Sequence, residues 1–280
     1  MSRVIRTPIA RLSTLLLLAS VTACGDDGAA ADEPTPAKRV VLRTAITADA
    51  AAKTKFTTNF GWKVTLDKAA VAVGAVYYFN GTPAFTMRDR APTLWQRFGD
   101  WFEGTAHAHP GHYQPGDALG QMLTASSYDL ESTAPGQLAD GDGVTGTFRS
   151  ARFVFASTTT GPAAALLGTH VAYARGVAEK ADGTSPGPIH FEVTADFADV
   201  AAQTASGQID GCTFTEAKVT ADGTVTIVLS PNVWFNVVDF TEIAPGTVAA
   251  PTPIALTTKA GIGFVNGLTQ LDAYTFDFTP

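Results

Sequence analysis

The sequence predicts a mainly β protein: an antiparallel β-sandwich with one short amphipathic helix in a long insertion. Short stretches rich in β-branched and aromatic residues recur from residue 39 to the end of the 280-residue chain. Gly, Asn, Asp and Pro separate these stretches, and closely spaced short strands with such turns are typical of sandwiches. Hydrophobic residues make up 45% of the chain, which is enough to build a core.

Residues 1–23 are predicted to be a bacterial lipoprotein signal peptide. Three arginines precede an apolar run that is too short to span a bilayer stably. The run ends at Val21-Thr22-Ala23-Cys24, which resembles the bacterial lipobox. The resemblance implies that Cys24 is acylated, becomes the mature N-terminus and anchors the protein in a lipid bilayer. The alternative is an ordinary secretory signal with an incidental cysteine.

Residues 24–38 are predicted to be the acylated cysteine and a flexible tether. Ala, Asp, Gly and Pro dominate this stretch, which therefore cannot bury enough apolar surface to order itself. Gly25 after the cysteine, where other lipoproteins have Asp, resembles outer-membrane sorting. We therefore expect a lipid-anchored protein of the bacterial cell envelope, on the periplasmic face of the outer membrane.

The charge balance excludes binding to nucleic acid through a general positive field. Lys and Arg total 19 against 26 Asp and Glu, a net charge of −7. Removal of residues 1–23 would take three arginines away and leave 16 − 26 = −10. Phosphate binding needs clustered Lys and Arg, so no nucleic-acid partner is expected.

The body of the chain, residues 39–280, is predicted to be a single β-sandwich domain. Its strands are expected at Val40–Ile46, Trp62–Leu66, Val71–Phe79, Arg149–Ser157 and Leu271–Phe278. The third of these leads into Asn80-Gly81, a strong tight-turn pair. In the last, Tyr274, Phe276 and Phe278 fall on one face, which predicts a final strand packed on the core.

Two hairpins are also predicted from the spacing of strand and turn signals. Residues 169–180 and 189–197 flank a loop rich in Gly and Pro. Residues 213–220 and 224–230 flank Asp222-Gly223. Each pair is expected to lie side by side and antiparallel.

Two segments have helical patterns. Residues 92–102 place four apolar side chains on one stripe after Pro92, which suits a first helical turn. This helix falls in a predicted insertion of about residues 80–145, and core packing is its default role. Residues 230–235 begin with Ser230-Pro231 and predict a short second helix.

The chemical candidate is a histidine cluster at His107, His109 and His112. In an extended segment His107 and His109 point to the same side, and Pro110-Gly111 can turn His112 back toward them. Neutral imidazoles suit a transition metal, copper or zinc. A fourth ligand is left open among five residues or water: Glu103, Asp117, His170, His190 and Cys212. The alternative is three exposed histidines on a solvated loop.

Other candidates have ordinary structural explanations. Cys212 is expected to be a small buried hydrophobe, and His190 to share a solvated strand face. Residues 183–187 match G-x-S-x-G, but a hairpin loop with Pro186 cannot form a nucleophile elbow. Residues 140–143 resemble part of a calcium loop, but an Asp/Gly turn explains them better. With no base or nucleophile constellation visible, no enzyme is expected.

Hydrophobic spacing over residues 40–280 also suggests a family resemblance. It rests on Gly61-Trp62 with Val64 and Leu66, Val73–Tyr78, Ile189 with Phe191, and Trp234-Phe235 before Asp239-Phe240. These elements resemble secreted β-sandwich proteins related to the periplasmic copper-binding protein associated with methanobactin uptake. The resemblance implies copper handling beside an outer-membrane receptor, and it supplies no ligand residue.

The expected function is binding of copper or zinc through the histidine cluster, for sequestration or for delivery to an outer-membrane receptor or another envelope protein. The alternative is an envelope interaction module that binds no metal.

Overall fold

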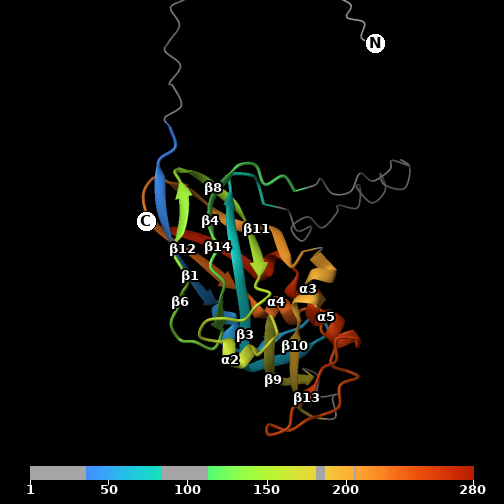
Figure 1. Ribbon diagram of the computed structural model, residues 1–280. Coiled ribbons are helices and arrows are strands. Elements are labelled where there is room, and N and C mark those ends of the chain that lie inside the picture. The colour runs from blue at the N-terminus through green and yellow to red at the C-terminus, as the bar shows by residue number, and fades with distance from the viewer. Residues whose placement is uncertain (1–35, 84–112, 181–186, 205) are drawn as a thin grey trace, which may run out of the picture. The chain divides into compact units, whose positions relative to one another are not determined.

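The computed structural model describes residues 36–83, 113–180, 187–204 and 206–280, and these are mainly β (Figure 1). Their strands join one 14-stranded sheet, which lies within the unit Ala37–Pro280. Among the residues described, no helix combines the length and the apolar character needed to cross a membrane.

Eight strands of the sheet close into a β-barrel, so the predicted sandwich is wrong. Around the barrel they are β3 (Trp62–Phe79), β4 (Ala118–Met122), β7 (Gly141–Val144), β1 (Arg39–Ala48), β12 (Gly223–Leu229), β14 (Tyr274–Thr279), β11 (Gln208–Val219) and β8 (Gly146–Phe155). Closure comes from pairing of β3 with β8, which sets Tyr77 opposite Arg152. The barrel is not purely antiparallel either, because β1–β12 and β11–β14 are parallel pairs. A local pattern of alternation indicates strands but not which strands pair.

Strand β3 connects the barrel to a smaller extension of the sheet. The two strands predicted at 62–66 and 71–79 are one strand of 18 residues. Register shifts between Leu66 and Lys68 and between Val73 and Val76 interrupt its pairing. Such bulges bend a strand and increase its twist. The first half of β3 pairs with β9 (Ala172–Lys180), and the second half pairs with β8 and β4.

The extension confirms one predicted hairpin. Strand β9 pairs antiparallel with β10 (Ile189–Ala195), and β10 pairs with β13 (Thr252–Pro253). Figure 1 shows these strands below the barrel. His190 lies opposite Val177, so His170 and His190 are not cross-strand neighbours, as predicted.

The second predicted hairpin is wrong, although both of its strands exist. Strand β14 lies between β11 and β12 and pairs with each of them. The connection between β11 and β12 therefore passes the end of β14. Beside it, an Asp222 carboxylate oxygen accepts a hydrogen bond from the Val41 backbone N–H at 2.8 Å. Thus the Asp222-Gly223 pair joins two strands that do not pair with each other.

Residues 118–144, part of the predicted insertion, contain strands rather than only loop. Besides β4 and β7 they include β5 (Ser126–Asp129), which pairs with β3, and β6 (Gly136–Gln137), which pairs with β1. A further short strand, β2 (Phe56–Thr57), also pairs with β3. The Asp/Gly turn predicted at 140–143 is mostly strand β7.

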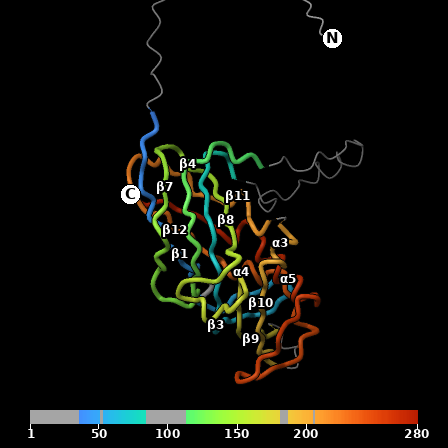
Figure 2. Tube along the Cα trace, in the orientation of Figure 1, coloured from blue at the N-terminus to red at the C-terminus, as the bar shows by residue number. Residues whose placement is uncertain are grey.

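Helices lie at the end of the unit that carries the extension. They are α2 (Ala164–Leu167), α3 (Phe197–Thr204), α4 (Pro231–Phe235) and α5 (Lys259–Leu268), with short 3-10 helices η1 (Ala50–Lys53) and η3 (Leu271–Ala273). Helix α4 confirms the prediction at residues 230–235. Helix α5 contacts both α3 and α4, and Figure 2 shows the three together beside β10.

Aromatic side chains fill the barrel. Tyr78, Phe148, Phe214 and Phe276 are buried, and their rings lie 5.6–6.3 Å apart in pairs contributed by four different strands. Tyr274 is also buried, so the predicted final strand does pack on the core. An eight-stranded barrel is just wide enough for side chains to fill it.

Candidate functional site

The predicted metal ligands His107, His109 and His112 lie outside the described residues. So do Cys24, Glu103 and the predicted helix at 92–102. For these residues the metal site and the lipid anchor stay predictions.

The four other candidate ligands are described, and the structure does not bring them together. Asp117 precedes β4 and bonds to Asn80, His170 pairs with Asp196, and His190 lies on β10. Cys212 is buried in β11. Within the ranges described, no group of three His, Cys, Asp or Glu side chains could hold a metal ion.

The structure does show how the segment carrying the histidine cluster is attached. The chain leaves the end of β3 through Asn80 and Gly81 and returns through Pro115 and Asp117. The Gly81 N–H donates to the Pro115 carbonyl at 2.8 Å. The Asp117 N–H donates to the Asn80 side-chain oxygen at 2.8 Å, and the Asn80 amide donates to the Asp117 carboxylate at 3.2 Å. Asn80-Gly81 is therefore not a two-residue hairpin turn, since its partners lie beyond residue 112.

Tyr113 and Ser150 add a second layer to this attachment. The Ser150 hydroxyl donates to the Gly81 carbonyl at 2.7 Å. Because that proton is used, the Tyr113 hydroxyl donates to Ser150 Oγ, 2.6 Å away. Burial raises the pKa of Tyr113, so its phenol keeps this proton at neutral pH. We call Asn80, Gly81, Tyr113, Pro115, Asp117 and Ser150 the loop base.

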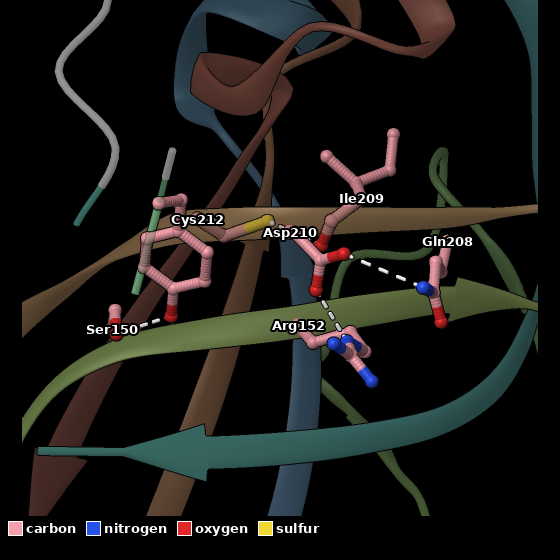
Figure 3. Close-up of polar contacts among 7 residues, drawn as sticks. Ser150, Arg152, Gln208, Ile209, Asp210 and Cys212 are labelled. Atoms are coloured by element: carbon pink, nitrogen blue, oxygen red, sulfur yellow. Dashed lines mark hydrogen bonds and ion pairs between the residues drawn. The ribbon is translucent and has the colours of Figure 1, made fainter. Parts of the chain in front are cut away.

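A charged pair lies beside the loop base on the outward face of the barrel (Figure 3). The Arg152 guanidinium of β8 forms an ion pair with the Asp210 carboxylate of β11, and Gln208 donates to the same carboxylate at 3.4 Å. The guanidinium also lies 5.9 Å from the ring centre of Tyr77 and 5.8 Å from that of Phe79. The ion pair neutralises both charges and joins β8 to β11. The contacts of the guanidinium with Tyr77 and Phe79 add β3, so these side chains link three neighbouring strands.

Gly211 explains why Cys212 points inward. It has a φ of 79°, and the pairing of β11 with β8 shifts between Asp210 and Cys212. This bulge reverses the alternation, so Asp210 faces out while Cys212 is fully buried. Full burial confirms the expected structural role, and it raises the pKa of Cys212 to about 12, so the thiol keeps its proton at neutral pH.

Sequence reasoning missed the loop base. Asn80-Gly81 and Pro115-Gly116-Asp117 both carry turn residues, the first at the start of the predicted insertion of residues 80–145 and the second within it. Turn residues on both sides of a long segment can bond to each other and hold its ends together. These two turns are the part of the sequence from which the loop base could have been predicted. Nothing in the sequence indicated Ser150, because its role depends on the pairing of β8 with β3.

No protein-family model, no curated protein sequence and no solved structure matches this chain.

Proposed function

We propose that this chain is a lipid-anchored protein of the bacterial envelope that binds copper or zinc through His107, His109 and His112. The loop base is the observation that supports this proposal. The role we propose is binding rather than catalysis: sequestration of the ion, or its delivery to an outer-membrane receptor or another envelope protein.

We expect the loop base to lower the entropic cost of metal binding. Both ends of the histidine segment are already joined to each other and to β8. Closing a loop costs conformational entropy, and here folding of the barrel has already closed the loop that carries the histidines. We expect this closure to restrict the arrangements open to the three histidines, and restriction before binding favours affinity.

The sequence at the returning end places one ligand next to a fixed residue. His112 immediately precedes Tyr113, whose hydroxyl is held by Ser150. The net charge of 16 − 26 = −10 after removal of residues 1–23 also favours approach of a cation over an anion.

The test is calorimetric titration of Cu(II) and of Zn(II) into purified residues 25–280. Wild type should bind one ion, and replacement of all three cluster histidines by Ala should abolish that binding. The matched control is His170→Ala/His190→Ala, which removes imidazoles elsewhere and should bind like wild type. Equal binding by wild type and the triple variant would refute the metal proposal and favour an interaction module without metal.

A further variant tests whether the loop base contributes. Asn80→Ala removes two hydrogen bonds of the base, each contributing about 1 kcal/mol, and should weaken metal binding by up to about thirtyfold.

Anchoring is tested separately with Cys24→Ser, which should move the protein from the membrane to the soluble fraction. Unchanged membrane association of that variant would contradict the anchor.

A further inference from the structure

A pocket of about 350 Å³ lies on the sheet extension, built from parts of the chain outside the loop base. Tyr173 of β9 with Glu192 and Thr194 of β10 line one side of it. Other lining residues come from α2 and the turn after it and from β13 and its end, including Leu166 and Ile254. The pocket therefore combines an apolar wall with a few polar groups, as ligand sites do.

His170 lines the pocket and is oriented by a carboxylate. Its ring Nδ1 lies 2.5 Å from Asp196 Oδ1, and its side chain is 36% exposed. Asp196 is itself positioned before α3, because its N–H donates to Asp199 Oδ2 at 2.8 Å. The Asp196 carboxylate bonds to the Nδ1 side of the ring, so Nε2 is the ring nitrogen left to bond to a ligand.

The charged carboxylate that could meet a cation in the pocket is that of Glu192. Glu192 lines it, and no Lys or Arg is among the described residues that do. Arg175 is not among these lining residues, but it lies opposite Glu192 in the sheet, and its guanidinium donates to the Val248 carbonyl and bonds to Tyr173. Burial raises the pKa of Tyr173, and the nearby Glu192 adds to that effect while Arg175 opposes it. The Tyr173 side chain thus lies within the fields of both the Glu192 carboxylate and the Arg175 guanidinium.

We propose that this pocket binds a primary alkylammonium ion with an apolar substituent of about benzyl size. The ammonium N–H groups would donate to the Glu192 carboxylate and to His170 Nε2, and the Tyr173 ring adds a cation–π contact. The substituent would pack against Leu166 and Ile254. A primary ammonium suits this arrangement because a carboxylate oxygen and the unprotonated nitrogen of a neutral imidazole both accept hydrogen bonds.

The probe is benzylammonium, titrated into the full chain in detergent and followed by NMR shifts of the His170 ring and the Glu192 amide. EDTA is present throughout, so the result does not depend on the proposed metal site. Wild type should saturate in the millimolar range or below, and neutral benzyl alcohol should bind at least tenfold more weakly. No shift at 20 mM benzylammonium, or equal binding of the alcohol, overturns the proposal.

Variants assign the binding to these groups. Glu192→Gln should weaken binding by about tenfold or more because it removes the carboxylate charge, and His170→Ala should weaken it by about tenfold because it removes a hydrogen bond to a charged group. Glu216→Gln, at an exposed carboxylate on β11 paired with Arg149, is the matched control and should bind like wild type. Unchanged far-ultraviolet circular dichroism and unfolding midpoints show that each variant is folded. Wild-type affinity in a folded Glu192→Gln protein refutes the site.

Discussion

Gly223 is where the observed strand order can be tested directly. A Cβ at this position would lie 2.4 and 2.5 Å from two ring carbons of Phe278 and 2.6 Å from the Thr279 carbonyl oxygen. An ordinary contact begins at 3.4 Å, so the Phe278 ring would have to move by about 1 Å. The carbonyl has less freedom, because Thr279 pairs with Thr224 in the sheet. These contacts exist because β14 lies beside β12.

We expect Gly223→Ala to lower the free energy of unfolding by about 2 kcal/mol, within the usual cost of overpacking. Phe278→Ala should cost about 1–2 kcal/mol, less than a fully buried Phe, because this ring is half-buried. Removing the ring relieves most of the clash at Gly223. The double variant should therefore be more stable than the sum of the two losses predicts, by about 1 kcal/mol.

The assay is urea unfolding of residues 25–280, followed by tryptophan fluorescence, for the wild type and the three variants. If β11 and β12 formed a simple hairpin, Gly223 would lie in its turn and Phe278 elsewhere. The two effects would then add to within about 0.5 kcal/mol. Additivity of that kind would refute the placement of β14 between β11 and β12.

Two further predictions concern titratable groups. Burial alone would raise the pKa of Asp239, but hydrogen bonds from Thr241 and from Trp62 Nε1, together with nearby Lys180, lower it below the usual value. Its stabilising contribution is therefore complete above the unfolded pKa of about 3.9 and lost as the pH falls through the lower folded value. Asp239→Asn should flatten the decline of the urea midpoint between about pH 4 and pH 2, and an unchanged decline would contradict this. Cys212 should resist a thiol reagent in the native protein and react only after unfolding, so rapid labelling of native protein at pH 8 would exclude its burial.

The strands that the sequence located were those with strong local signals. Alternation over Tyr274 and Phe276 predicted the final strand, and the spacing around residues 181–188 predicted the hairpin of β9 and β10. In a strand, alternate side chains face the core, and a hairpin needs only a short turn between its arms. Each of these two signals lies within one short stretch of the chain, so the sequence alone could reveal it.

Closure of the barrel, the position of β14 and the loop base were decided only by the tertiary structure. Closure joins Tyr77 to Arg152, and the loop base joins Gly81 to Ser150. Each contact links residues far apart in the chain, and alternation is the same whichever strand lies alongside. Pairing is chosen by the free energy of the whole sheet, through core packing and the removal of open edges. For that reason the sequence predicted a β protein with a histidine segment, and the fold decided that the segment starts and ends at one point on a closed barrel.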